Sequence, residues 1–324
     1  MNLDRTLRIL EVGHDPWIAP CYEADFLAIG GSLRPGNSAR PMPWAVTSKI
    51  IWRIISGSYD VIALPPMHVR RLIGLGHKAR LAKKLFGLLA GSDFLGRIVR
   101  RLMSRRKTMI VVFDIDDAVK VSDEVCRIFQ PQIYFKRNLL RKDLLRDPLL
   151  LRHLPMGIGE CGPSNSGVTA DLFVCGEYST EARRTTLEAA RRLRSLGWRV
   201  DIVETRIAYS EYRRRLAQAK AAFCFQGIGF HTWRMYEAAC SGTIPIIDRP
   251  ESDVIHDFID SENCIIVAPS FDEIVLSVDE LLRSPQKLSR ISAGAYRLAE
   301  SKYTRRACAR YLIEEIAGRF TLFR

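Results

Sequence analysis

The sequence predicts an α/β protein in which two doubly wound, Rossmann-like domains follow one another along the chain. Short apolar runs typical of strands alternate with helical patterns through most of the sequence, which is the pattern of parallel sheets with helices on both faces. A chain of 324 residues with 47% hydrophobic content can bury a sizeable core and divide in two. The stretch 155–167 is rich in Gly, Pro, Ser and Asn, so we place the linker between the domains there.

The N-terminal domain is predicted to cover residues 1–160, the C-terminal domain residues 161–303. Strands are expected in the first domain at 7–13, 59–64, 109–113 and 132–135, and in the second at 170–175, 199–203, 221–225, 244–247 and 264–267. A helical pattern fills residues 304–324. Because ligands of such sheets bind beyond the carboxyl ends of the strands, the residues that follow each strand are the first candidates for a site.

The run from 227 to 247 joins a glycine-containing loop, a short helix and a buried strand. Gly227 and Gly229 allow the backbone to approach a ligand closely. Thr232 stands where it would cap a helix over 233–241, whose first amides would face outward and favour an anion. The run therefore predicts a site for a phosphate group.

Arg234 and Glu237 lie three residues apart on that helix and so share a face. The cation would reach a diphosphate, and the carboxylate would accept hydrogen bonds from ribose or sugar hydroxyls. The alternative is a local surface ion pair. Gly242 then ends the helix before the strand at 244–247.

The pattern Arg-x-x-Glu-Ala-x-x-x-Gly-x-Ile-Pro-Ile-Ile at 234–247 resembles the donor-binding segment of GT-B glycosyltransferases, in particular the exostosin-like and family 1-like ones. The resemblance extends over about residues 170–305. It implies two Rossmann-like domains facing a cleft, a nucleotide sugar as substrate, and neither a further cofactor nor a catalytic metal. It also implies that the helix at 304–324 crosses back to the N-terminal domain.

One position departs from the common retaining GT-B group, which carries a second Glu eight residues before the helix Glu. Gly229 occupies this position here, so an inverting reaction is expected. The resemblance then implies that a side chain of the N-terminal domain deprotonates the acceptor. The candidates that follow predicted strands are His14, Asp15 and Asp114, although the acidic run 114–117 is also typical of a helix N-terminus.

Further donor-side candidates follow from their positions. Gly176 and Tyr178 come directly after the first C-terminal strand, where an ordinary turn is the alternative. Lys136 and Arg137 follow a strand of the N-terminal domain and are phosphate candidates, with a solvated pair as the alternative. His231 lies within the glycine loop, where it would contact the donor or simply pack.

The net charge of +13 implies an anionic partner. Residues 70–107 are rich in Lys and Arg interleaved with apolar residues. This basic cluster would lie on an anionic membrane surface, or it would pack its apolar side on the N-terminal sheet. Nucleic acid is disfavoured because this segment lacks the aromatic residues of stacking platforms. The basic cluster would suit a lipid-linked acceptor.

The remaining motifs mostly exclude functions. The eight cysteines are scattered without a C-x-x-C pair, which predicts free thiols and no structural zinc. The G-x-G-x-x-G run at 157–162 continues into Pro163 rather than a helix, so we interpret it as a hinge and not as a dinucleotide site. No signal peptide or membrane-spanning run is recognisable, which predicts a cytoplasmic protein, with the inner face of the membrane as a variant.

The sequence thus predicts a glycosyltransferase that moves a sugar from a nucleotide sugar to a saccharide or lipid-linked saccharide, in surface polysaccharide or glycoconjugate synthesis. The alternatives are a non-catalytic protein of the same fold that binds a membrane surface or nucleic acid, and a sugar-nucleotide epimerase.

Overall fold

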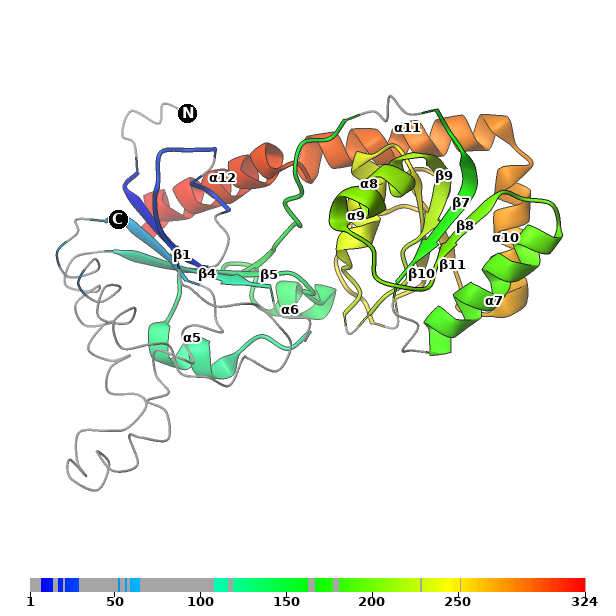
Figure 1. Cartoon of the computed structure of the whole chain (residues 1–324). Helices are drawn as coiled ribbons and strands as arrows, with labels where there is room; N and C mark the ends of the chain where they lie inside the picture. Colours follow the sequence, from blue (N-terminus) through cyan, green and yellow to red (C-terminus); the bar gives the residue numbers. More distant parts are fainter. Residues whose placement is uncertain are drawn as a thin grey trace, which may run out of the picture. The chain divides into compact units, whose positions relative to one another are not determined.

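The computed structural model describes residues 7–13, 17–19, 21–28, 52, 56, 59–64, 108–115, 119–162, 167–176, 181–227, 229–250 and 252–323. The chain forms two compact units, each an α/β body (Figure 1). The first unit comprises residues 1–116, 120–154 and 309–324, and the second comprises 117–119 and 155–308. The sequence-based boundaries, after residues 160 and 303, lie six and five residues away from these. The basic segment 70–107 lies outside the described residues.

The first unit contains a parallel six-stranded sheet in the order β2-β1-β3-β4-β5-β6. Its strands are β1 (Ile9–Gly13), β2 (Asp25–Ala28), β3 (Val61–Leu64), β4 (Met109–Asp114), β5 (Ile133–Lys136) and β6 (Leu151–His153). The central strands β3, β4 and β5 are buried at every position, which explains their continuous apolar sequences. The two edge strands, β2 and β6, are short and contain charged residues, and the sequence analysis did not predict them.

Among the helices whose full bounds the structure describes, three belong wholly or partly to this unit. Ser122 is the N-cap of α5 (Asp123–Phe129), and its hydroxyl accepts from the Val125 amide. α6 (Arg141–Arg146) leads into β6. α12 (Arg305–Phe323) belongs to the first unit from residue 309 onward. There the Tyr311 hydroxyl donates to the His153 carbonyl at 3.1 Å, and the Tyr311 ring packs edge-on against Phe135.

The second unit contains a parallel five-stranded sheet in the order β11-β10-β9-β7-β8. Its strands are β7 (Ala170–Cys175), β8 (Val200–Val203), β9 (Ala219–Phe223), β10 (Ile244–Asp248) and β11 (Ile265–Val267). All five fall on or within two residues of the predicted strands. The helices are α7 (Glu181–Ser195), α8 (Tyr209–Ala217), α9 (Trp233–Cys240), α10 (Phe271–Leu282) and α11 (Pro285–Lys302).

The helices of the second unit cover both faces of its sheet, with α7 and α10 on one face and α8 and α9 on the other (Figure 1). Side chains of β7, β9, β10, α7 and α10 share one buried apolar cluster. On α7 the buried positions are Thr186, Ala189, Ala190 and Leu193, a spacing that follows the helical repeat. The predicted α/β class with doubly wound parallel sheets is therefore confirmed.

The strand order places a topological switch point between β7 and β9. The chain runs from β7 to the edge strand β8, and then returns to the opposite side of β7 as β9. In open parallel sheets of this kind, ligands bind beyond the carboxyl ends of the two strands where the order reverses. The residues at that place are Gly176, after β7, and the loop 224–227, after β9.

The predicted linker is structured over part of its length. The Ile158 amide donates to the Tyr303 carbonyl at 2.7 Å, and Ile158 and Met156 are buried. Residues 159–162 form no helix, so the G-x-G-x-x-G run lacks the strand-turn-helix context of a dinucleotide site. Among the helices of the described residues, none is long and apolar enough to cross a bilayer.

Asp171, at the amino end of β7, should make the stability of the second unit depend on pH. Its buried carboxylate accepts from the Arg199 side chain at 3.1 Å and pairs with Lys220 at 2.8 Å. Desolvation favours the protonated form, but these hydrogen bonds outweigh it and hold the pKa of Asp171 well below its usual 3.8. A depressed folded-state pKa stabilises the fold above the unfolded value, and this contribution is lost as the pH falls below it.

We therefore expect the stability difference between wild type and Asp171→Asn to be largest near neutral pH and to shrink below about pH 4. Urea unfolding measured between about pH 7 and about pH 3 tests this. Asp272→Asn, at an exposed position in the first turn of α10, is the matched control. A stability difference that stays constant over this range would contradict the prediction.

Candidate functional site

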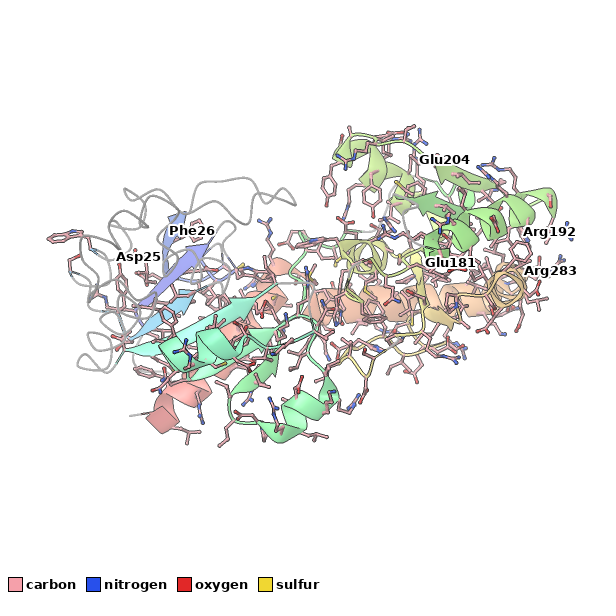
Figure 2. The ribbon with its side chains drawn as sticks, turned by 90° about the horizontal axis from the view of Figure 1, so that it is seen from below. Asp25, Phe26, Glu181, Arg192, Glu204 and Arg283 are labelled. Carbon is pink, nitrogen blue, oxygen red and sulfur yellow. The ribbon has the colours of Figure 1, made fainter. Side chains whose placement is uncertain are left out.

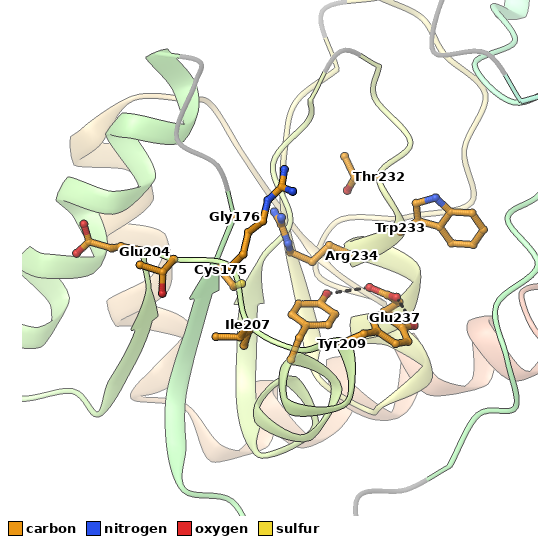
Figure 3. Close-up of a pocket in the computed structure, with 12 residues that line it drawn as sticks. Cys175, Gly176, Glu204, Ile207, Tyr209, Thr232, Trp233, Arg234 and Glu237 are labelled. Atoms are coloured by element: carbon orange, nitrogen blue, oxygen red, sulfur yellow. Dashed lines mark hydrogen bonds between the residues drawn. The ribbon is translucent and has the colours of Figure 1, made fainter. Parts of the chain in front are cut away.

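A cavity of about 670 Å³ opens at the carboxyl edge of the sheet in the second unit (Figure 3). The loops that follow β7 and β8, the start of α8 and the first turns of α9 enclose it. This volume lies within the range of small-molecule and cofactor sites, about 300–1,000 Å³. The cavity borders the switch point between β7 and β9, and several of its side chains are those that the sequence singled out.

Gly176 and Arg234 are in contact at the centre of this region (Figure 3). Gly176 has a φ of +154°, and a Cβ atom there would lie 2.7 Å from Nη2 of Arg234. Only glycine accepts both the backbone conformation and the close approach. The structure thus brings together two predicted donor-binding residues that lie 58 positions apart, and it places a guanidinium at the carboxyl end of β7.

A second guanidinium, that of Arg183 on α7, lies close by. Arg183 Nε donates to the Gln226 carbonyl at 3.2 Å, and a Cβ at Gly227 would lie 2.9 Å from Arg183 Nη2. Arg183 and Arg234 line the same small cavity beside Gly176. Arg183 was not predicted as a site residue, because it stands in an arginine pair on a strongly basic helix and no local signal distinguishes it.

The loop at Gly227 is fixed from two sides. The Asp248 carboxylate, at the end of β10, accepts from the backbone amide of Gln226 at 2.8 Å. Arg183 donates to the backbone carbonyl of the same residue. The Gly227 amide in turn donates to the Gly229 carbonyl at 3.2 Å. Gly227 therefore allows the close approach of Arg183, and the Gly229 carbonyl accepts a hydrogen bond within the loop.

Thr232 occupies the N-cap position of α9, but its side chain does not cap the helix, contrary to the prediction. Its backbone is extended, with φ −99° and ψ 144°, and its hydroxyl donates to the Cys224 carbonyl at 3.4 Å. The first amides of α9 thus have no side-chain acceptor from their own cap. An anion placed at this helix end would satisfy them.

Glu237 is buried, with only 5% of its surface exposed, so the alternative of a surface ion pair is wrong. One carboxylate oxygen accepts from the Tyr209 hydroxyl at 2.7 Å (Figure 3), and the other accepts from the Tyr212 hydroxyl at 2.8 Å. Desolvation, together with the adjacent carboxylate, raises the pKa of both phenols. The tyrosines therefore remain protonated donors, and they keep a carboxylate at the wall of the cavity in a fixed orientation.

His231 adopts the packed alternative. Only 2% of its surface is exposed. Nε2 faces the Ile255 carbonyl at 3.0 Å and must donate to it, so Nδ1 accepts from the Tyr236 hydroxyl. Both ring nitrogens are thus used within the domain, and the structure does not support the proposed contact of His231 with the donor.

Three candidates of the first unit, Asp114, Lys136 and Arg137, are buried at the ends of β4 and β5. The Asp114 carboxylate accepts from the Tyr134 hydroxyl at 2.6 Å and pairs with Lys136 at 3.2 Å. Lys136 is fully buried, and Arg137 is only 7% exposed, so the solvated-pair alternative is wrong for both. Lys136 serves an internal ion pair instead of a phosphate site, and Asp114 is not an open catalytic carboxylate. His14, Asp15 and Tyr178 lie outside the described residues.

Replacement of Gly176 by alanine should abolish tight nucleotide binding without unfolding the protein. The added Cβ strains the backbone, and its clash is with the end of the Arg234 side chain rather than with the main chain, so this predicted donor-binding side chain must move. We expect a loss of affinity similar to that of Arg234→Ala, measured by calorimetry, with an unchanged circular dichroism spectrum. Gly159→Ala, where a Cβ would meet no atom within 4 Å, is the control and should bind normally.

Comparison with known families agrees with this geometry. Residues 180–314 match the model of a family described as glycosyl transferase-like. This range contains most of the cavity and all of α9. A search of curated proteins returned no match to the sequence.

Several solved structures resemble the whole chain in fold. HepE of Anabaena in complex with UDP-glucose has a TM-score of 0.56 at 11% identity, over 97% of this chain and 100% of that one. Sucrose-phosphate synthase of Thermosynechococcus elongatus has a TM-score of 0.58 at 12% identity, again over 97% and 100%. A UDP-N-acetylglucosamine 2-epimerase has a TM-score of 0.51 at 11% identity, over 98% of each chain. These likenesses confirm the predicted GT-B fold.

Proposed function

We propose that this GT-B protein, with its glycosyl transferase-like second domain, transfers a sugar from a nucleotide sugar to an acceptor hydroxyl. The observation that supports this most strongly is the contact of Arg234 with Gly176 beside the uncapped start of α9. This contact brings together a cation, a glycine backbone and the positive end of a helix at one edge of the cavity.

The donor diphosphate would lie between Arg234, Arg183 and the first amides of α9. Guanidinium groups bind phosphate oxygens with two parallel hydrogen bonds and remain charged at any physiological pH. Glu237 would accept from the hydroxyls of the ribose, because its oxygens retain acceptor capacity beyond the two phenols. The cavity volume of about 670 Å³ is sufficient for a nucleotide.

Transfer is a displacement at the anomeric carbon. The acceptor oxygen forms the new bond, the bond to the nucleoside diphosphate breaks, and the acceptor proton goes to a general base. Arg234 and Arg183 would stabilise the charge that develops on the leaving phosphate, a role that lowers the barrier only if it is stronger in the transition state. We propose an inverting, metal-independent reaction, since Gly229 stands where the retaining group has Glu and two cations would face the leaving group at the proposed diphosphate position.

The acceptor is proposed to be a saccharide or a lipid-linked saccharide, as in the assembly of surface polysaccharide or glycoconjugates. The strongly basic chain, with a net charge of +13, is consistent with an anionic lipid or membrane surface near the acceptor. A sugar-nucleotide epimerase is the second candidate, because a solved epimerase resembles the whole chain. It would convert its substrate without any acceptor.

The test is a thermal-shift panel of UDP, GDP, CMP, ADP and TDP, followed by product analysis with the matching nucleotide sugar. A ligand that binds the native state at about 100 times its dissociation constant stabilises that state by about 2.7 kcal/mol. Arg234→Ala should lose the shift. Arg192→Ala should keep it, because Arg192 lies at the outer surface on α7 (Figure 2).

The outcomes separate the candidates. A shift with one nucleotide, together with sugar transfer that requires an acceptor, supports the proposal. Product formation without an acceptor favours the epimerase. The absence of any shift with folded protein and millimolar nucleotide would leave the non-catalytic alternative, in which the fold serves only to bind an anionic partner.

A further inference from the structure

Tyr209, the first residue of α8, combines exposure with an unusually fixed ring. It is 63% exposed and lines the cavity. Its hydroxyl is held by Glu237 at 2.7 Å, and its ring stacks on that of Tyr212 with centroids 6.0 Å apart and an interplanar angle of 25°. An exposed tyrosine normally moves among rotamers, whereas this one is restrained at its hydroxyl and along one face.

The support behind Tyr209 extends into the core. The Tyr212 ring packs against Phe173 of β7, with centroids 5.9 Å apart, and Phe173 is fully buried. The second phenol, that of Tyr212, donates to the other oxygen of Glu237. A buried strand residue, a second ring and a shared carboxylate thus hold Tyr209 in place, while its side chain remains exposed at the cavity.

We infer that Tyr209 is the platform on which the nucleobase of the donor stacks. The inference rests on the proposed function, which places the diphosphate at Arg234 and the ribose at Glu237. The base is bonded to the same ribose, so it would lie beside Glu237. Two rings are hydrogen-bonded to Glu237, and of these the ring of Tyr209 is the exposed one. Stacking on an aromatic ring accepts any base, because every base has a π face.

The arrangement also makes Tyr209 and Glu237 a single unit. The phenol that orients the carboxylate for the ribose belongs to the same side chain as the ring that receives the base. The loop at 204–207, directly before α8, lines the same cavity and offers polar backbone groups to the edge of a stacked base. The choice among bases would therefore come from this loop, and the common affinity for bases from Tyr209.

The test compares Tyr209→Leu and Tyr209→Phe in calorimetric titrations with UDP, GDP and ADP and with inorganic pyrophosphate, which lacks both base and ribose. We expect Tyr209→Leu to weaken binding of the preferred nucleoside diphosphate roughly 5- to 150-fold, the range for loss of one base–aromatic stack. Its affinity for pyrophosphate should change by less than about twofold. Tyr209→Phe keeps the ring and should lose less affinity than the leucine variant. With the matching nucleotide sugar, KM should rise while kcat changes little.

Three results would overturn the inference. If Tyr209→Leu binds the nucleoside diphosphate as wild type does while Arg234→Ala does not, the platform is wrong and the proposed function stands. If Tyr209→Leu weakens pyrophosphate by the same factor, the residue acts only on the phosphate end. If wild-type protein binds none of the nucleoside diphosphates, both the platform and the proposed function fail.

Discussion

Arg234→Ala is expected to reduce the rate of sugar transfer by about 10²- to 10³-fold, the usual effect of removing one donor to a developing negative charge. Arg234 is held beside Gly176 at the cavity, where the leaving diphosphate would lie. Its loss should also weaken binding of the nucleoside diphosphate, because phosphate oxygens would lose a charge-assisted pair of hydrogen bonds. Steady-state kinetics together with calorimetry would measure both effects.

Arg234→Lys distinguishes charge from geometry. Lysine keeps the cation but lacks the planar fork that matches phosphate, so we expect its activity to lie between those of the wild type and the alanine variant. Arg192→Ala, on the outer surface of α7, should behave as wild type. Transfer by Arg234→Ala at the wild-type rate would remove the leaving-group role and with it the main support for the proposed site.

The sequence allowed much of the second unit to be predicted, because its information is local there. All five strands are mostly apolar, and the glycine loop, α9 and β10 follow one another in one segment. Edge strands such as β6 (Leu151–His153) were missed since they bury only one residue fully and so resemble loops. Arg234 and Gly176 were identified separately, but nothing local in the sequence indicates that they touch.

Three residues of the site could not be predicted, because no local sequence pattern distinguishes them. Arg183, Tyr209 and Tyr212 stand on helices where arginine and tyrosine are common, and only the fold brings them to Gly227 and Glu237. A tyrosine pair on a buried carboxylate leaves no spacing signal, because the two tyrosines lie 25 and 28 residues from Glu237. Such contacts depend on which helix covers which strand end.

Lys136 illustrates the opposite error. In a chain with 49 Lys and Arg residues, a lysine after a strand was interpreted as a phosphate ligand or a solvated residue, and it is fully buried instead. β5 is a central strand of its sheet and is buried along its whole length, so a charge at its end must find a partner inside. Asp114, its neighbour in register on β4, supplies that partner.

Lys136→Met is therefore expected to destabilise the first unit by about 3–5 kcal/mol, the usual cost of leaving one member of a buried pair without its counterion. The carboxylate of Asp114 would keep the Tyr134 hydroxyl as a donor, but its buried charge would lose the Lys136 ammonium at 3.2 Å. Urea unfolding followed by fluorescence measures the loss. Lys142→Met, at an exposed position on α6, is the matched control and should change stability by less than about 0.5 kcal/mol.

The double variant Asp114→Asn, Lys136→Met decides whether Asp114 has a catalytic role. Removal of both charges takes away the desolvation cost, and the asparagine oxygen still accepts from Tyr134, so most of the stability should return. Because Asp114 is engaged in an internal ion pair and a hydrogen bond, we expect this variant to retain transfer activity. A stable double variant that has lost activity by more than about 100-fold would instead identify Asp114 as the general base, since general acid–base groups typically contribute about 10²- to 10⁴-fold. Retained activity would direct the search for the base to His14 and Asp15.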